Sequence, residues 1–263
     1  TAAAVPGGVD VEQPTMNAMQ APLIVAIDGP SGVGKSTVAR LLARRLRVPM
    51  LNTGAMYRTV ALDALESGVD PSDRKEMRKR LKDLDLDLRP DGDGGIEVLL
   101  RGDPVGGRIR TPEVSTAASI VSAHSAVRKR MVEIQRRFGQ RGGGVLEGRD
   151  IGTVVFPDTP FKFFLDARAD VRAERRYREL VAAGQGSTQE EVLRDLEERD
   201  DRDRKRQDSP LTVTDEHFQI DTSDLLPPEI VERMVGVIRS KQVRESDEES
   251  SDDESAGDAG DAA

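Results

Sequence analysis

The stretch GPSGVGKST, residues 29–37, constrains the fold of this chain more than any other segment. It fits the pattern G-x-x-x-x-G-K-[ST], follows the aliphatic run LIVAI at residues 23–27, and leads into a helical pattern. Glycines let such a loop curl until its N–H groups point inward, and the start of the following helix adds its positive dipole end. The segment therefore predicts a strand, a phosphate-binding loop and a helix, in that order.

The rest of the chain alternates short apolar runs with helical stretches, a pattern typical of a parallel sheet covered by helices on both faces. Strands are expected at residues 22–28, 49–52, 143–147, 161–165 and 217–221. Helices are expected at residues 35–47, 54–66, 112–138, 169–183, 188–206 and 228–240. The predicted fold class is α/β, a phosphate-loop NTPase-type parallel sheet flanked by helices.

One segment breaks this alternation of strands and helices. Residues 84–110, LDLDLRPDGDGGIEVLLRGDPVGGRIR, alternate apolar with polar side chains around glycine-rich turns. Such alternation between turn signals indicates short antiparallel strands. We therefore expect a small antiparallel β insert, and the sequence leaves open whether it contributes to substrate specificity or is only a surface hairpin.

The two ends of the chain differ in composition from its centre. Residues 1–20 show no apolar periodicity, and residues 245–263 carry nine acidic side chains and no basic one. Segments that cannot bury enough apolar surface to offset their ordering entropy stay disordered. We therefore expect two disordered tails around one domain at residues 21–244.

The net charge of −9 comes from the acidic tail, so the remainder of the chain is neutral. A neutral body argues against nucleic-acid binding, which requires an excess of lysine and arginine. The longest purely aliphatic run, LIVAI, is too short to cross a bilayer, and the absence of cysteine excludes disulfides and thiol catalysis. We expect a cytoplasmic monomer that binds neither nucleic acid nor membrane.

Two side chains of the phosphate-binding loop have specific tasks. Lys35 should reach the β- and γ-phosphate oxygens of a nucleotide, and the Ser36 hydroxyl should ligate Mg²⁺. The carboxylate that supports the metal is left open, because Asp28 could contact it through water or only end the strand, and Asp150 and Asp166 are further candidates. The whole loop comprises Gly29, Pro30, Ser31, Gly32, Val33, Gly34, Lys35, Ser36 and Thr37.

Three classes of protein share such a loop, namely GTPases, motor ATPases and small-molecule kinases. The guanine signature Asn-Lys-x-Asp is absent, because neither Asn17 nor Asn52 precedes a lysine. Motor ATPases fit poorly, since they generally need a catalytic glutamate beside an acidic strand end and an arginine from a partner, whereas this short chain carries its own arginine cluster. Transfer of a phosphoryl group to a small acceptor is therefore favoured.

The arginine cluster is the run RDDRDRKR at residues 199–206. On a helix, four of its side chains fall within an arc of about 100° and carry a net charge of plus two: Arg199, Arg202, Asp203 and Arg206. The opposite side holds four side chains whose charges cancel: Asp200, Asp201, Arg204 and Lys205. The pattern predicts a basic stripe that binds an anion and a neutral, solvated back.

Several segments together resemble the bacterial cytidylate kinase family. They are LNTGAMYR at 51–58, IRTPEVSTAAS at 109–119, EGRDIGTVVFPD at 147–158 and ERDDRDRKRQDSPL at 198–211, and the similarity covers residues 22–240. The resemblance implies a nucleoside monophosphate kinase that transfers the γ-phosphoryl of ATP, bound with Mg²⁺ at the loop, to CMP or dCMP. It also implies that the β insert enlarges the monophosphate-binding region and that residues 184–210 form a mobile lid.

The resemblance further implies roles for individual residues. The acceptor site would be lined by Thr53, Tyr57 and Arg58, with the CMP phosphate on Arg58 and Arg149. The cytosine base would be bound by Ser119, Arg128 and Asp150, and the sugar would be approached by Asp203. The catalytic residues would be Lys35, Arg199 and Arg206, of which the two arginines close over the phosphates. Threonine stands at position 53, where serine is frequent in the family, and its hydroxyl preserves the hydrogen bond.

The base assignment agrees with the edge of cytosine, which presents an amine donor beside the N3 and O2 acceptors. A uracil carbonyl facing Asp150 would leave a lone pair unmatched, at a cost of about 1–3 kcal/mol, which disfavours UMP by roughly ten- to a hundredfold. Purely structural roles stay open for Ser119, Arg128 and Tyr57. For the whole chain two alternatives stay open: a P-loop kinase for another small acceptor, such as a different nucleoside monophosphate or shikimate, or a nucleotide-binding regulatory module without turnover.

Overall fold

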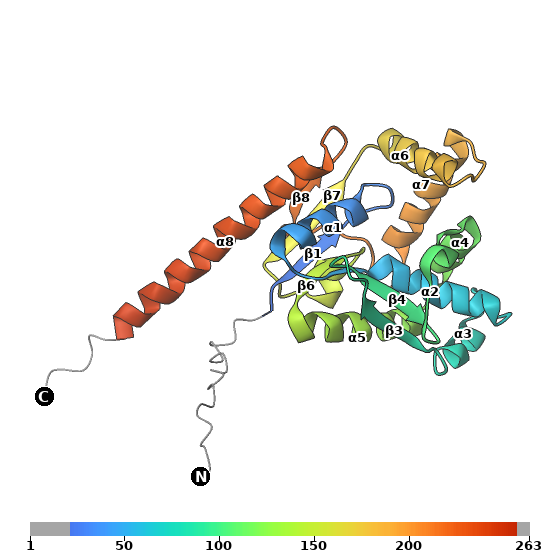
Figure 1. The fold of residues 1–263 in the computed structure, drawn as a ribbon, viewed down its shortest axis with the longest axis horizontal. Coiled ribbons are helices and arrows are strands. Elements are labelled where there is room, and N and C mark those ends of the chain that lie inside the picture. The colour runs from blue at the N-terminus through green and yellow to red at the C-terminus, as the bar shows by residue number, and fades with distance from the viewer. Residues whose placement is uncertain (1–21, 257–263) are drawn as a thin grey trace, which may run out of the picture.

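The computed structural model describes residues 22–256, with side chains up to residue 243, as a parallel sheet flanked by helices and a smaller antiparallel sheet (Figure 1). The strands of the main sheet are β1 (Ile24–Asp28), β2 (Met50–Asn52), β6 (Gly144–Glu147), β7 (Phe161–Asp166) and β8 (Phe218–Asp221). They pair in parallel, in the order β2-β6-β1-β7-β8. The predicted α/β class is confirmed, and all five expected strands form.

Helices cover both faces of this sheet. They are α1 (Lys35–Leu46), α2 (Thr53–Glu66), α4 (Pro112–Val121), α5 (Ser125–Gly142) and α8 (Pro227–Ala256). Val25 and Ile27 of the central strand β1 pack in one core with α1 and α8, whereas Ala26 packs in a second core with α2, α4 and α5. Burial on both faces explains why the β1 sequence is continuously aliphatic.

The β insert expected from the sequence is a three-stranded antiparallel sheet. Its strands β3 (Leu86–Pro90), β4 (Ile96–Leu100) and β5 (Asp103–Pro104) pair in the order β3-β4-β5. A short helix that the sequence analysis did not identify, α3 (Arg74–Arg80), precedes the insert. The Asp73 side chain caps α3 by accepting hydrogen bonds from the first free N–H groups of the helix.

Two further helices, α6 (Ala169–Ala182) and α7 (Gln189–Lys205), form a hairpin at the edge of the molecule (Figure 1). Their shared core is small, with Ala173 on α6 packed against Val192 and Leu196 on α7. Thr188 and Glu191 form a capping box that fixes the start of α7. The polar contacts of α7 with the rest of the chain therefore matter for its position.

The single helix expected at residues 112–138 is wrong, because the chain forms α4 and α5 with a break at residues 122–124. His124 takes an extended conformation, with φ −83° and ψ 120°, and its Nε2 lies 2.7 Å from the carbonyl oxygen of Pro71. The break is thus supported by a tertiary contact with a segment far away in the sequence. No glycine or proline marks it.

Helix α8 ends at Ala256, well beyond the end expected at residue 240. The structure therefore gives residues 245–256 a helical backbone where the sequence predicts disorder. Extending a helix adds one hydrogen bond per residue and needs no core of its own, since the buried turns at Ile230, Met234 and Ile238 already anchor it. The other parts of the predicted disordered tails, residues 1–20 and 257–263, lie outside the described residues.

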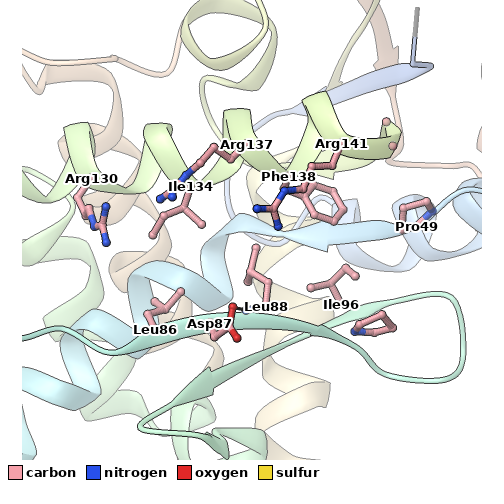
Figure 2. A pocket seen from close by; sticks show the side chains of 13 residues that line it. Pro49, Leu86, Asp87, Leu88, Ile96, Arg130, Ile134, Arg137, Phe138 and Arg141 are labelled. Carbon is pink, nitrogen blue, oxygen red and sulfur yellow. Dashed lines mark hydrogen bonds between the residues drawn. The ribbon is translucent and has the colours of Figure 1, made fainter. Parts of the chain in front are cut away.

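A cavity of about 510 Å³ lies between the β insert and α5 (Figure 2). Apolar side chains from both elements and three arginines of α5 line it, among them Leu86, Leu88, Ile96, Ile134, Phe138, Arg130, Arg137 and Arg141. None of its lining residues is one of the candidate site residues, so this cavity is distinct from the candidate active site. Within residues 22–256, no helix combines the length and apolar character needed to span a bilayer.

Candidate active site

The phosphate-binding loop joins β1 to α1 at the edge of the main sheet where the strands end. Gly34 takes a left-handed conformation, φ 89°, directly before α1. At Gly29, φ is 148°, and a Cβ would lie only 2.1 Å from the carbonyl oxygen of Leu165 on β7. Glycine is therefore required at position 29 for the loop to pass so close to the neighbouring strand.

Lys35, the first residue of α1, is buried, and its Nζ donates a hydrogen bond to the carbonyl oxygen of Pro30. Burial and, after it, the positive charge of Arg149 lower the pKa of Lys35 from 10.5 to about 7, and the Glu147 and Asp200 carboxylates oppose this only in part. A desolvated ammonium group that lacks full compensation favours an incoming polyanion. The electrostatics of Lys35 thus fit the phosphate-binding task expected from the sequence.

Ser36 follows Lys35, and its hydroxyl donates a 2.6 Å hydrogen bond to Oε1 of Glu147, at the end of β6. The other candidate carboxylates are engaged elsewhere. Both oxygens of Asp28 accept backbone N–H groups, from residues 151 and 152, Asp150 pairs with an arginine, and Asp166 accepts the backbone N–H of residue 167. Glu147, which the sequence analysis did not single out, is therefore the carboxylate beside the Ser36 hydroxyl.

A hydroxyl and a carboxylate offer the oxygen ligands that Mg²⁺ prefers, and Mg²⁺ usually takes only one or two protein ligands together with phosphate oxygens and water. Among the described side chains, no group of three or more His, Cys, Asp or Glu residues could hold a metal without a substrate. The pair of Ser36 and Glu147 thus fits a magnesium ion that arrives with a nucleotide.

Two arginines at the site have no hydrogen-bond or ion-pair partner within the described part of the chain: Arg58 on α2 and Arg199 on α7. Burial lowers the pKa of Arg58, and burial followed by the charge of Arg149 lowers the pKa of Arg199 to about 10. The charge of Arg58 lowers the pKa of Arg199, and the charge of Arg176 lowers the pKa of both groups. The structure therefore gathers positive charge beside the loop that the Glu147 and Asp203 carboxylates compensate only in part, as a polyanion site requires.

Arg149, in contrast, is fully engaged. Its Nε donates to Oδ2 of Asp203 at 2.8 Å, its Nη2 to the Ser31 hydroxyl at 2.8 Å, and its Nη1 to the carbonyl oxygen of Gly148 at 3.1 Å. Asp203 is buried and also accepts a 3.2 Å hydrogen bond from Nη1 of Arg206. Burial alone would raise the pKa of Asp203, but Arg149 and Arg206 outweigh it and lower that pKa. The carboxylate therefore stays ionised and, through Arg149, ties α7 to the loop.

The residues expected around the base lie together. Arg128 on α5 and Asp150 form a buried ion pair, and the Arg128 guanidinium stands 5.3 Å from the centre of the Tyr57 ring. Several polar atoms nearby are buried without a hydrogen-bond partner among the described residues: Tyr57 Oη, Arg128 Nε, Arg206 Nη2 and both amide atoms of Gln135. Buried polar atoms without partners are costly, so this group fits a pocket that is completed by a polar ligand.

Two other predicted site residues make contacts within the protein. The Thr53 hydroxyl donates a 2.8 Å hydrogen bond to the backbone oxygen of Glu147, which holds the start of α2 against the end of β6. The Ser119 hydroxyl on α4 accepts a 3.0 Å hydrogen bond from Nε of Arg202 on α7. Both hydroxyls thus connect elements that surround the site.

The helical stripe predicted for residues 199–206 is only partly correct. Helix α7 ends at Lys205, and Arg206 is extended, with φ −62° and ψ 143°. Its side chain still turns back to Asp203, while its Nε donates to the carbonyl oxygen of Ser209 at 2.6 Å. The prediction that the opposite side of this helix is solvated is wrong for Asp200. This side chain is 1% exposed, because α7 packs against the phosphate-binding loop on that side as well.

Sequence reasoning missed several residues around the site. They are Glu147, Asp200, Gln135, Arg172 and Arg176. Glu147 carried a usable signal, since it is an acidic residue at the end of a buried strand. The others lie on helices, where only the tertiary arrangement shows which face meets the loop.

The fold and the loop define a class of protein, the P-loop nucleotide-binding proteins. The family model for cytidylate kinase matches residues 25–240. A cytidylate kinase from Syntrophotalea carbinolica is 45% identical over 85% of this chain and 95% of its own length. Cytidylate kinases from Geobacter sp. and Mycolicibacterium paratuberculosis are 43% and 42% identical, over 83% and 85% of this chain and 94% and 98% of their own lengths. The chain therefore belongs to the cytidylate kinase family.

Proposed function

We propose that the chain transfers the γ-phosphoryl group of ATP to CMP or dCMP and releases CDP or dCDP with ADP. The observation that carries this proposal is the pair of unpartnered guanidinium groups, Arg58 and Arg199, beside the buried Lys35. One polyphosphate would compensate Lys35, and the additional charge suits a second, phosphate-bearing substrate. The relatives named as cytidylate kinases support cytidylate as that substrate.

Selection of the base would rest on Asp150 and Arg128. Their ion pair is buried, so a base that enters the pocket must match its hydrogen-bonding pattern. The carboxylate can accept from the cytosine amine, and the guanidinium can donate to the N3 or O2 acceptor. Uracil presents a carbonyl where cytosine presents the amine, so the same groups disfavour UMP.

The chemistry requires no general base, because an oxygen of the acceptor phosphate is already a nucleophile near neutral pH. The protein must instead bring two anions together and stabilise charge in the transition state. Lys35 would hold the β- and γ-phosphates, Arg58 and Arg149 the acceptor phosphate, and Arg199 and Arg206 the transferring group. Asp203 would orient Arg149 and Arg206 through the hydrogen bonds described above and approach the sugar.

Magnesium would arrive with ATP and bind at the Ser36 hydroxyl with support from Glu147. When bound, it supplies positive charge to the phosphate oxygens. The loop glycines and the buried lysine hold the remainder of the polyphosphate. The lid expected at residues 184–210, which contains α7, would keep water from the transferring group.

A screen of nucleoside monophosphates with Mg·ATP, followed by coupled detection of ADP, tests this proposal. CMP and dCMP should give the highest kcat/KM. A higher kcat/KM for another nucleoside monophosphate, or for shikimate, would establish the alternative of a different small acceptor. ATP binding without turnover on any acceptor would establish the regulatory module instead.

A further inference from the structure

Ser31 in the phosphate-binding loop is held at all three of its polar groups by different elements. Its backbone N–H donates to Oδ1 of Asp200 on α7 at 3.1 Å. Its carbonyl oxygen accepts from Nη1 of Arg172 on α6 at 3.0 Å, and its hydroxyl accepts from Nη2 of Arg149 at 2.8 Å. Ser31 is thus the point at which the loop, helices α6 and α7, and the end of β6 meet.

Asp200 does not resemble a surface charge of a lid. It is 1% exposed, and its Oδ2 accepts from Arg172, which is 6% exposed and also donates from Nε to the carbonyl oxygen of Ala167 at 3.2 Å. Burying a carboxylate is unfavourable unless partners satisfy it, and here both of its oxygens have partners. The neighbouring Asp201 is exposed and pairs with Lys205.

These contacts close a ring between α7 and the loop. Asp200 binds the Ser31 N–H, the Ser31 hydroxyl binds Arg149, and Arg149 binds Asp203, one helical turn further along α7. Arg199 precedes Asp200 directly, so anchoring Asp200 sets where the Arg199 side chain starts. Position and orientation of α7 relative to the loop are therefore fixed at two carboxylates.

We propose that Asp200 is a positioning residue that latches the lid onto the phosphate-binding loop and so places Arg199 and Asp203 for transfer. The latch uses the Ser31 N–H, whereas the Lys35 ammonium and the Ser36 hydroxyl stay available for the nucleotide. Loss of the latch should therefore weaken the catalytic arrangement more than nucleotide binding. This inference rests on the proposed phosphoryl transfer to CMP.

The test compares Asp200→Ala with Asp201→Asn, which removes a charge from the exposed face of the same helix. Asp200→Ala should lower kcat about thirtyfold, which corresponds to about 2 kcal/mol of activation free energy at 1.36 kcal/mol per tenfold. The concentration of active sites is determined by stoichiometric ATP binding. The KM for ATP should change less than about threefold, because the loop itself is intact. Asp201→Asn should match the wild type in both constants.

Asp200→Asn separates positioning from a role in stability alone. Its amide oxygen can still accept the Ser31 N–H although the charge facing Arg172 is lost, so it should retain a clearly higher kcat than Asp200→Ala at an equally lowered melting temperature. A kcat of Asp200→Ala within about threefold of Asp201→Asn would overturn the latch, as would a loss confined to the KM for ATP. If Asp200→Ala does not fold, Asp200→Leu, which has a similar size and no acceptor for the Ser31 N–H, takes its place, and the same two outcomes overturn the latch. A wild-type protein that does not phosphorylate CMP would instead refute the proposed function.

Discussion

Replacing Lys35 by methionine should stabilise the free protein while abolishing transfer. Methionine has a similar length and no charge, so it fits the buried position without the desolvation that the ammonium group suffers there. The phosphate-binding task is lost with the charge. Opposite effects on stability and activity are expected wherever a binding site holds a charge that only the ligand compensates.

The magnitude follows from the fall of the Lys35 pKa from 10.5 to about 7. A difference of that size corresponds to roughly 4 kcal/mol of destabilisation at neutral pH, at 1.36 kcal/mol for each pH unit, and this is an upper bound because the buried site can relax. Losing the hydrogen bond to Pro30 works against the gain. We expect Lys35→Met to raise the free energy of unfolding by about 1–3 kcal/mol at pH 7.

The pH dependence identifies the cause. Between about pH 7 and pH 10.5 the unfolded lysine binds a proton that the folded one lacks, so the wild type gains stability as the pH rises. The advantage of Lys35→Met should therefore be full at and below about pH 7 and shrink toward pH 9. Urea unfolding of both proteins at pH 6, 7, 8 and 9 measures it. A variant that is no more stable than the wild type, or an advantage independent of pH, would refute the reasoning.

Three further predictions concern the acceptor site, the lid and the tail. Asp150→Asn should reduce the ratio of kcat/KM for CMP over UMP by about tenfold or more, because an amide can also donate to the uracil carbonyl; an unchanged ratio in the coupled assay would place base selection elsewhere. Arg206→Ala should lower kcat about a hundredfold at saturating ATP and CMP, whereas Arg204→Ala, an exposed position on α7, should have little effect; equal losses at fixed ionic strength would mean that total lid charge matters rather than position. Deleting residues 245–263 should leave kcat and KM within about twofold, and a KM that falls on deletion only at low salt would show instead that the acidic tail competes for the arginines.

The parts of the fold that the sequence predicts well are those determined by local patterns. Short apolar runs that alternate with helical stretches predict the five parallel strands, and period-two alternation predicts the β insert. Helix boundaries that depend on tertiary contacts were missed. The break before α5 carries no glycine or proline, and the contact of His124 with Pro71 joins segments that are 53 residues apart.

The candidate site shows the same division. The loop motif gives Lys35 and Ser36 directly, because their task follows from their place in the pattern. Asp200 could not be assigned in this way, because helical phase separates the two sides of α7 but does not show that both sides meet other elements. Arg206 lies beyond the end of α7, so the helix expected at residues 188–206 is one residue too long at its end.

The arginines of the site divide into two groups with different physical tasks. Arg128, Arg149 and Arg172 are bound to carboxylates, which compensates their charge and fixes their geometry. Arg58 and Arg199 have no such partner within the described residues, and burial lowers the pKa of both. Compensated arginines can organise a site before a ligand arrives, whereas uncompensated ones gain most from an anion, and more so as charge develops in the transition state. The paired arginines therefore hold the site in one arrangement, and Arg58 and Arg199 can bind the phosphate groups during transfer. Because only these two arginines of the site lack a carboxylate partner in the described part of the chain, repulsion among the cations stays small.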